Sequence, residues 1–341
     1  MIKHLLIIRL SALGDVAMTV PAVRALAIQH PDLKITILSR DFFKPLFQDI
    51  PNVSFYAADV KGKHKGVLGL KKLSSELKKL EVDAVADLHS VLRSNILKLF
   101  FKLSGIPVVQ IDKGRKEKKQ LVEGKIFQQL KTTHQRYLDV FQQLGFDVSY
   151  TSESLSPKSA IPQKALDILK EKKEKWIGIA PHAAFEGKMY PLDLMEKVIA
   201  SLNDKEGVKT LLFGGPEDKR VLDSLAQKYH HVESMVGKLS FEEELQLISN
   251  LDIMLSMDSG NAHLASVFGV KTITLWGVTH PYAGFYPFDQ SPKYALLADR
   301  NQFPLIPTSI YGNKFPEGYE NAMRTIQPAA VVEKVVDVLE A

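Results

Sequence analysis

Four loop segments carry residue types that could bind and activate a phosphorylated or hydroxylated substrate. Each follows an apolar run typical of a buried strand and precedes a stretch with helical periodicity. In a parallel sheet, ligands bind beyond the carboxyl ends of the strands, so side chains at these positions are candidates for chemistry. The segments are Gly14-Asp15, Pro181–Pro191, Gly214–Glu217 and Asp258–His263.

Asp15 is the candidate general base. It lies in a short turn after the first apolar run, where a carboxylate can project from the sheet and take a proton from a hydroxyl. The alternative is structural, because Asp is a preferred N-cap of a following helix. The residue type and its position are compatible with both roles.

The segment from Asp258 to His263 is a candidate phosphate loop. Its small residues allow backbone NH groups to approach a phosphate, and a helix that begins here adds partial positive charge. In the alternative interpretation, Asp258 or Ser259 only caps that helix. The candidate binding residues of this segment are Asp258, Ser259, Gly260, Asn261 and His263.

The two remaining segments add a cation and a second carboxylate. His182 and Lys188 follow an apolar run, and Lys188 could neutralise a diphosphate as a point charge, the alternative being a solvated loop lysine. Glu217 follows a pair of glycines and could accept hydrogen bonds from ribose hydroxyls. Its alternative role is to cap the next helix.

Several kinds of chemistry are excluded or weakly supported. The chain has no cysteine, which excludes disulfides, thiolate zinc sites, cysteine-ligated iron–sulfur clusters and a cysteine nucleophile. It also lacks the GxGxxG, GxxxxGK[ST], HExxH and GxSxG motifs, which disfavours nicotinamide, P-loop, zincin and α/β-hydrolase chemistry. The histidines are scattered. We therefore expect no metal site and no cofactor.

Strand-like and helix-like segments alternate along the whole chain, which is typical of parallel sheets covered on both faces. The periodicity fails in the Ser- and Pro-rich stretch 151–163, and the same alternation then restarts. The sequence predicts an α/β protein with two doubly wound domains, residues 1–155 and 164–327, and a final amphipathic helix within 328–341. The expected strands lie within 4–10, 34–40, 53–59, 83–90, 176–182, 208–215, 252–258 and 271–277.

No segment predicts export or membrane insertion. The apolar run 5–8 is too short for a signal sequence, and the stretch 96–109 contains Lys98 and Lys102 and is shorter than the roughly 20 residues that span a bilayer. We therefore expect a cytoplasmic protein.

Charge is unevenly distributed along the 341 residues. Residues 1–150 contain 24 Lys and Arg against 14 Asp and Glu, a net +10, whereas residues 151–341 contain 20 against 25, a net −5. A basic half indicates an anionic partner. Within it, the stretch 95–103 interleaves apolar residues with Lys98 and Lys102, which predicts either a membrane-surface helix or an ordinary cover helix with two snorkelling lysines.

Five stretches together resemble glycosyltransferase family nine, the heptosyltransferases of lipopolysaccharide core synthesis. The likeness covers nearly the whole chain, and its two end motifs are specific in combination. The stretches are LLIIRLSALGDVAMTVPAVRAL, IAPHAAFEGKMYPLDLMEKVIASL, GGPED, MVGKLSFEEELQLISNLDIML and SMDSGNAHLASVFGVKTITLWGVTHP.

The resemblance implies a GT-B architecture, in which two Rossmann-like domains face a central cleft. The first domain would bind the acceptor, the second the nucleotide sugar, and the helix in 328–341 would cross back to the first. By the same likeness Asp15 is the catalytic base, Lys188 the phosphate lysine, and the loop of Asp258, Gly260 and His263 the sugar and diphosphate site. Ribose and adenine would be held by Glu217 and by the backbone of Gly237, Lys238 and Leu239.

The implied reaction is inverting, metal-independent transfer of heptose from ADP-heptose to a hydroxyl of the lipopolysaccharide inner core. The implied partners are that donor, an acidic lipid-linked acceptor and, peripherally, the inner membrane. Two departures from the family pattern stand near Lys188. Ala183-Ala184-Phe185 replaces hydroxyl residues, so any phosphate contact there must come from the backbone, and Tyr190 replaces a tryptophan before Pro191.

Two other functions compete with this interpretation. A nucleotide-sugar epimerase of the same fold would need no second sugar site, and the basic first half argues against it. A nucleic-acid or membrane-surface binding protein would use the lysines within 61–79 and 113–131. No aromatic residues interleave with those lysines as single-strand binding requires, so we expect no nucleic-acid partner.

Overall fold

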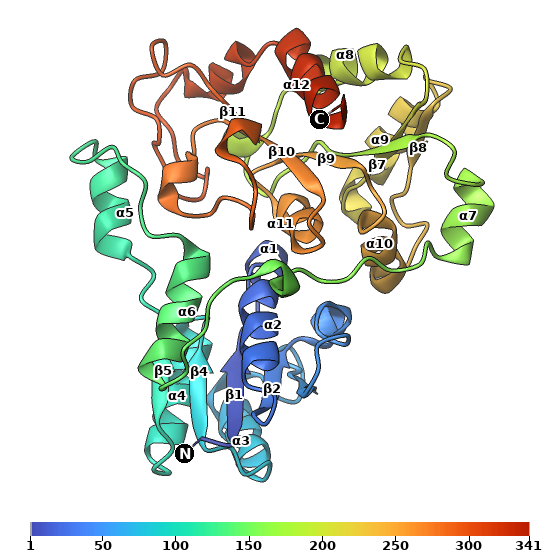
Figure 1. Cartoon of the computed structure of the whole chain (residues 1–341). Helices are drawn as coiled ribbons and strands as arrows, with labels where there is room; N and C mark the ends of the chain where they lie inside the picture. Colours follow the sequence, from blue (N-terminus) through green and yellow to red (C-terminus); the bar gives the residue numbers. More distant parts are fainter. Residues whose placement is uncertain (1, 341) are drawn as a thin grey trace. The chain divides into compact units, whose positions relative to one another are not determined.

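The computed structural model describes residues 2–340, which form two compact units (Figure 1). The first comprises the chain through Gly114 together with Lys131–Ser156. The second comprises Arg115–Leu130 and the chain from Pro157 onward. The main crossing between the units thus falls in the stretch 151–163, where the periodicity of the sequence fails.

The first unit is built on a five-stranded parallel sheet of order β3-β2-β1-β4-β5. Its central strand β1 is buried at every position, because it pairs with β2 on one side and β4 on the other and helices cover both faces. The strand order reverses between β1 and β4. The strands are β1 (His4–Ile8), β2 (Lys34–Ser39), β3 (Val53–Ala57), β4 (Ala84–Asp87) and β5 (Val108–Gln110).

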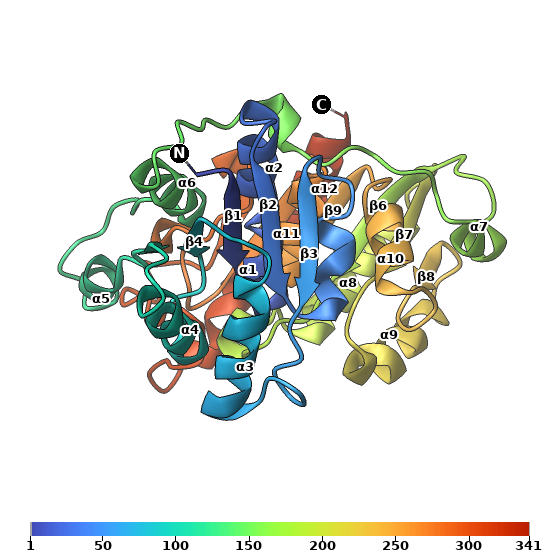
Figure 2. The ribbon, with the colours of Figure 1, turned by 90° about the horizontal axis from the view of Figure 1, so that it is seen from below.

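Helices cover the two faces of this sheet separately. α3 packs against α4 (Figure 2), whereas α2 packs against α6. Both α3 and α4 contribute side chains to one apolar cluster on the sheet. Local caps fix several starts, as where the Thr132 hydroxyl accepts from the NH of Gln135 at the start of α6. The helices are α1 (Leu13–Ala17), α2 (Val20–Gln29), α3 (Gly66–Lys78), α4 (Leu92–Lys102) and α6 (Thr133–Gln143), with 3-10 helices η1 (Asp41–Leu46) and η2 (Ser152–Ser154).

The second unit repeats the plan with a six-stranded parallel sheet of order β11-β10-β9-β6-β7-β8. Here the strand order reverses between β9 and β6, which pair in the centre of the sheet. The strands are β6 (Lys175–Ala180), β7 (Val208–Leu212), β8 (Val232–Ser234), β9 (Ile253–Met257), β10 (Lys271–Trp276) and β11 (Ala295–Leu297).

Helices of the second unit surround its sheet and share one large core. The final helix α12 packs on α8, β9 and β10 of this unit, and the apolar side chains Val331, Val335 and Val338 join its core. The helices are α5 (Arg115–Val122), α7 (Gln163–Leu169), α8 (Leu192–Asn203), α9 (Lys219–Ala226), α10 (Phe241–Ile248), α11 (Gly260–Val267) and α12 (Pro328–Glu340), with 3-10 helices η3 (Glu186–Lys188), η4 (Pro216–Asp218), η5 (Pro281–Ala283), η6 (Pro292–Tyr294) and η7 (Tyr319–Thr325).

The segment Arg115–Leu130 belongs to the second unit, although the sequence pattern includes it in the first domain. Leu121 and Leu130 are buried in a small apolar cluster with Ala283, and Lys118 lies 3.9 Å from the centre of the Phe285 ring. The Leu130 NH also donates to the carbonyl of Tyr282 at 2.9 Å. These contacts are long-range in sequence, which is why local periodicity does not reveal them.

The two parallel, doubly wound sheets confirm the predicted fold class. Among residues 2–340 the structure has no helix that is both long and apolar enough to cross a membrane.

Candidate functional site

An ion pair between Arg9 and Asp15 lies where the strand order of the first sheet reverses. Arg9 directly follows β1, and Asp15 stands in the first turn of α1. The guanidinium Nη2 lies 2.5 Å from Oδ2 of Asp15. The N-cap position of α1 is Ala12, so the structural alternative in which Asp15 caps this helix is wrong.

Every nitrogen of the Arg9 guanidinium has a partner. Nε donates to the carbonyl of Ser11 at 2.9 Å, and Nη1 donates to the carbonyl of Leu88, just beyond β4, at 2.7 Å. Arg9 therefore ties together the ends of the two strands at the reversal and presents Nη2 to Asp15 in a fixed orientation.

The same strand ends hold a buried histidine. Nδ1 of His89 accepts from the NH of Leu10, and Nε2 lies 3.4 Å from the hydroxyl of Ser11. Burial, together with the nearby positive charges of Arg9 and Lys113, lowers the pKa of His89 to about 3. His89 is therefore neutral at ordinary pH and adds no second positive charge beside Asp15.

In the second unit, an ion pair between Lys188 and Asp258 lies where the strand order of the second sheet reverses, between β6 and β9. Lys188 ends η3 in the loop after β6, and Asp258 directly follows β9. The Nζ of Lys188 lies 2.7 Å from Oδ2 of Asp258, and that oxygen also accepts from the hydroxyl of Thr279 at 3.0 Å. The fold thus brings together two residues that the sequence predicts from separate loops.

Gly312 shapes the space in which the lysine side chain lies. Its φ of +76° favours glycine, and a Cβ there would lie 2.6 Å from Cγ of Lys188. The loop is held by hydrogen bonds from the backbone NH groups of Tyr311 and Gly312 to the hydroxyl of Ser309. A side chain at this position would therefore displace Lys188.

His182 and Glu217 lie in neighbouring loops but do not contact each other through any described bond. Nδ1 of His182 lies 3.1 Å from Oδ1 of Asp218, and Oδ2 of Asp218 accepts from the NH of Gly215 at 2.8 Å. Glu217 is exposed in η4 and is not the residue that caps α9, since that position is Asp218. Asp218, the neighbour of the predicted Glu217, is thus the residue whose hydrogen bonds hold this turn.

The start of α11 has no side-chain cap. Ser259 occupies the N-cap position in an extended conformation, but its hydroxyl pairs with that of Ser256 at 2.9 Å. Gly260 and Asn261 begin the helix half-exposed, and His263 is buried one turn further on. Ser259 thus holds the N-cap position that the alternative predicts, but neither its side chain nor that of Asp258 bonds to the first amides of α11.

The segment Gly237–Leu239 forms a turn between β8 and α10. Gly237 has a φ of +70°, and the NH of Lys238 donates to the carbonyl of Met235 at 3.1 Å. The Nζ of Lys238 pairs with Glu233, and Leu239 is half-buried. The backbone of this turn lies at the carboxyl end of β8. The other candidate loops follow strands at the same edge of the sheet.

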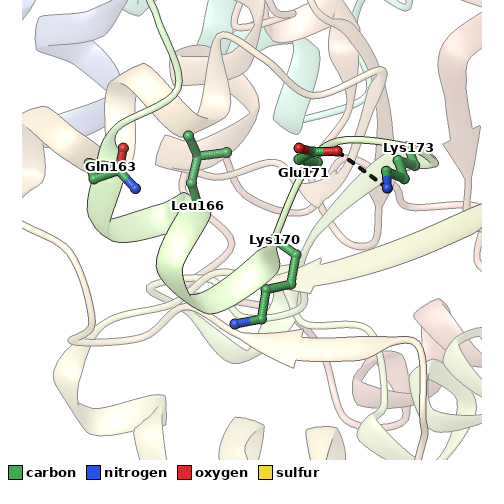
Figure 3. Close-up of a pocket in the computed structure, with 5 residues that line it drawn as sticks. All are labelled: Gln163, Leu166, Lys170, Glu171 and Lys173. Carbon is green, nitrogen blue, oxygen red and sulfur yellow. Dashed lines mark ion pairs between the residues drawn. The ribbon is translucent and has the colours of Figure 1, made fainter.

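A separate surface pocket of about 490 Å³ lies along α7 and the residues that follow it (Figure 3). Its only ion pair joins Nζ of Lys173 to Oε2 of Glu171 at 3.3 Å, and both side chains are largely exposed. None of the predicted site residues lines it. In the part of the chain that the structure describes, no three His, Asp or Glu side chains gather in a way that could hold a metal ion.

Sequence reasoning missed Arg9, Asp218, Thr279 and Gly312. Asp218 and Thr279 are revealed only by contacts between different loops, which no local pattern encodes. A signal for Arg9 exists, because an arginine at the end of an otherwise apolar strand must find partners when it is buried. Gly312 stands in an irregular stretch where one glycine among several has no distinguishing pattern.

Comparison with known proteins gives consistent matches. The model of glycosyltransferase family 9 (heptosyltransferase) matches residues 70–302. The lipopolysaccharide core heptosyltransferase OpsX of Haemophilus influenzae is 25% identical over 285 residues, which cover 82% of this chain and 80% of that relative.

Solved structures show the same fold. A family 9 glycosyl transferase from Veillonella parvula superposes with a TM-score of 0.78 at 19% identity, covering 99% of this chain and 97% of that one. The heptosyltransferase WaaC of E. coli, solved with ADP, gives a TM-score of 0.68 at 19% identity and covers 98% and 99%.

Proposed function

Because this chain belongs to glycosyltransferase family 9, the heptosyltransferases, we propose that it moves a heptose from ADP-heptose to a hydroxyl of the lipopolysaccharide inner core. The donor and the acceptor are taken from similar proteins, of which one is named for the lipopolysaccharide core and another was solved with ADP. In this chain, the strongest support is the Lys188–Asp258 pair beside the uncapped start of α11. A cation and free backbone amides together suit a diphosphate.

Asp15 is the proposed general base on the acceptor side. Its carboxylate takes the proton of the attacking hydroxyl while that oxygen bonds to the anomeric carbon of heptose. The bond from that carbon to the diphosphate oxygen breaks, and ADP departs with the electron pair. Attack opposite the leaving group inverts the configuration in a single step, without a covalent enzyme intermediate.

Lys188 and the first amides of α11 are the proposed diphosphate ligands. Negative charge grows on the leaving diphosphate in the transition state, so a fixed cation and fixed NH groups stabilise it without a divalent metal. His182, Ser259, Gly260, Asn261 and His263 would complete the sugar and phosphate site, with Asp258 positioned to accept from heptose hydroxyls. Glu217 and the turn of Gly237, Lys238 and Leu239 would hold ribose and adenine.

We further propose that the enzyme meets its acceptor at the inner face of the cytoplasmic membrane. A lipopolysaccharide-type acceptor is lipid-linked and acidic, and the first unit carries the larger positive charge. Peripheral contact with an anionic membrane would therefore place the enzyme where its substrate is concentrated.

The direct test is transfer by the purified protein. ADP-heptose and a core acceptor lacking its terminal heptose are mixed with the enzyme, with and without EDTA, and products are followed by mass spectrometry. We expect the acceptor to gain one heptose in both conditions. No gain in mass with any heptose-deficient acceptor contradicts the proposal, and loss of activity only with EDTA contradicts its metal-free mechanism.

The same experiment discriminates against the other functions. An epimerase would alter the donor in the absence of acceptor, whereas the proposed enzyme would leave it unchanged apart from slow hydrolysis. A nucleic-acid binding protein would retain RNA on a filter and transfer no sugar.

A further inference from the structure

Helix α4 carries a row of leucines on the face that points away from its sheet. Leu92, Leu99 and Leu103 are 76%, 56% and 75% exposed, and their spacing of seven and four residues places them on one side of the helix. Leu97 and Phe101 lie on the opposite side and are fully buried in the core of the unit. The helix is thus apolar on both its inner and its outer face, which an ordinary cover helix is not.

The neighbouring helix α3 continues this apolar surface. α3 packs beside α4 on the same face of the sheet (Figure 2), and its own inner face contributes Leu70, Leu73 and Leu77 to the shared core. On its first turn Val67 and Leu68 are exposed. The outer sides of both helices therefore face away from the same sheet.

This surface is positively charged and free of carboxylates over long stretches. No Asp or Glu occurs between Asp59 and Glu76 or between Asp87 and Asp112. The first of these intervals includes the beginning of α3, and the second includes all of α4. Lys63 pairs with Glu76 of α3 at 2.7 Å. The other exposed cations within the two intervals are Lys61, Lys65, Lys71, Lys72, Arg93 and Lys102.

We propose that the outer face of α3 and α4, defined by Val67, Leu68, Leu92, Leu99 and Leu103 with the surrounding cations, docks on an anionic lipid bilayer. The proposal rests on the lipid-linked acceptor of the proposed function and names the surface that reaches the membrane. The leucines enter the boundary between headgroups and acyl chains, and the lysines contact lipid phosphates.

Charge selects a bilayer over a general apolar partner. The exposed Phe42 in η1 lies between the exposed Asp41 and Lys44, so charges of both signs flank it. On the α3–α4 outer face the exposed apolar side chains stand among an excess of cations, and the carboxylate of Glu76 in α3 is already paired with Lys63. That combination is complementary to acidic headgroups over an acyl layer.

The test is co-sedimentation of the full-length protein with phosphatidylglycerol-containing vesicles, without acceptor or donor. The triple variant Leu92→Ser, Leu99→Ser, Leu103→Ser is compared with Phe42→Ser in the same unit and Leu305→Ser in the other unit. We expect the triple variant to lower the partition coefficient by about 10-fold to 100-fold, because three partly inserted leucines lose their burial. The two control variants should bind like the wild type.

A second arm tests the charge. Lys71→Gln, Lys72→Gln and Lys102→Gln together should weaken binding to anionic vesicles, and raised salt should weaken binding of the wild type in the same way. Unchanged sedimentation of the leucine variant overturns the proposal. So does a leucine variant that loses self-association in analytical ultracentrifugation while still binding vesicles, because the face would then contact a second copy of the chain.

Transfer to a soluble, lipid-free core oligosaccharide separates this inference from the proposed function. We expect the leucine variant to retain wild-type kcat on that acceptor and to lose rate on the vesicle-embedded acceptor. Failure of the wild type on both acceptors counts against the proposed function, whereas equal rates of variant and wild type on the embedded acceptor count against this surface.

Discussion

The two units place the same kind of ion pair at the same kind of position, and they expose opposite partners. In the first unit the arginine side chain is 5% exposed and its aspartate 37%. In the second unit the lysine is 15% exposed and its aspartate 6%. Both pairs lie beyond the carboxyl ends of two strands where the order of a parallel sheet reverses, which is where ligands of such sheets bind.

This difference matches the chemistry proposed for each unit. A general base must offer its carboxylate to an acceptor hydroxyl, and in the first unit the cation is the partner held inside. A diphosphate ligand must offer positive charge, and in the second unit the buried carboxylate and Thr279 orient the lysine from behind. One architecture therefore presents a negative group in one unit and a positive group in the other.

The two units differ less in net charge than the two halves of the sequence do. The first unit holds 19 Lys and Arg against 13 Asp and Glu, a net +6, and the second holds 25 against 26, a net −1. The contrast shrinks because Arg115–Leu130, with five basic and two acidic residues, belongs to the second unit. The basic character that remains in the first unit is concentrated around α3 and α4.

The largest expected effect is on the accessible carboxylate of the first unit. Asp15→Asn keeps the shape but removes the base, so kcat should fall by about 100-fold to 10,000-fold. Donor affinity, measured by ADP titration calorimetry, should hardly change, because the proposed donor ligands lie in the other unit. Asp49→Asn, which also removes an aspartate paired with a buried arginine, is the control and should keep its activity.

Removing Lys188, the more exposed partner of the pair in the second unit, should act on donor binding and on rate together. Lys188→Met leaves a diphosphate without its point charge in both ground and transition states, so we expect kcat/KM to fall by about 100-fold to 1,000-fold. Lys172→Met breaks a comparable pair with Asp252 elsewhere in the unit and controls for stability. If magnesium restores the Lys188 variant, the metal-free assignment is wrong.

Arg9 should act through Asp15, and a pH profile can show it. Without the guanidinium beside it the carboxylate is harder to ionise, so Arg9→Gln should move the acidic limb of kcat/KM to higher pH. Loss of orientation should also lower the rate by about 10-fold to 100-fold. Arg9→Lys restores the positive charge but not the bonds from all three guanidinium nitrogens. It should therefore restore the position of the acidic limb more fully than it restores the rate.

The control for Arg9 lies in the same unit. Arg24 is buried to a similar degree and pairs with Asp49, whose exposure equals that of Asp15. Arg24→Gln should lower stability to a similar extent without moving the pH profile. If both variants shift the profile equally, Arg9 has only a structural role.

The comparison also shows what local sequence can predict. Central strands such as β1 and β9 are mostly apolar and buried at every position, and the sequence predicts them near their observed positions. The strands it misses, β5, β8 and β11, have three residues each and lie at sheet edges, where one side is unpaired and the apolar pattern is weak. The segment Arg115–Leu130 is misassigned because its partners lie far along the chain.

The candidate site follows the same division. Asp15, Lys188 and Asp258 can be nominated as candidates from their residue types and their positions after strands. Arg9, Thr279 and Asp218 cannot, because each acts by bonding to a loop that is distant in sequence. Local sequence can thus nominate candidate ligand-facing residues, whereas the residues that orient them are found only in the tertiary structure.

Gly312 offers a smaller and more selective perturbation of the second pair. Gly312→Ala combines the strain of a positive φ with a direct clash against Lys188, whereas Gly318→Ala has a similar φ and open space around the new Cβ. We expect Gly312→Ala to have a kcat/KM for the donor about 10-fold lower than that of Gly318→Ala. In a Lys188→Met background the difference should vanish. If it persists there, Gly312 acts on the backbone and not on the lysine.

The smallest effect concerns stability and compares a buried histidine from each unit. Burial, with nearby Arg9 and Lys113, lowers the pKa of His89 from 6.5 to about 3, and burial with Arg300 lowers that of His280 to about 4. Below pH 6.5 the unfolded chain binds protons that the folded one does not, so stability falls as pH drops toward these folded values.

Each histidine contributes at most about 1.4 kcal/mol per pH unit to this loss. Chemical denaturation between pH 7 and about pH 4.5 should therefore show a shallower decline for His89→Asn and for His280→Asn than for the wild type, even where the variants are less stable at neutral pH. The exposed His230 supplies the control, because His230→Asn should leave the slope unchanged. Parallel slopes for the His89 variant and the wild type would show that His89 takes up a proton in the folded protein as readily as in the unfolded one. A second positive charge would then lie beside Asp15 at low pH, and the contrast between the arginine of the first unit and the lysine of the second would no longer hold.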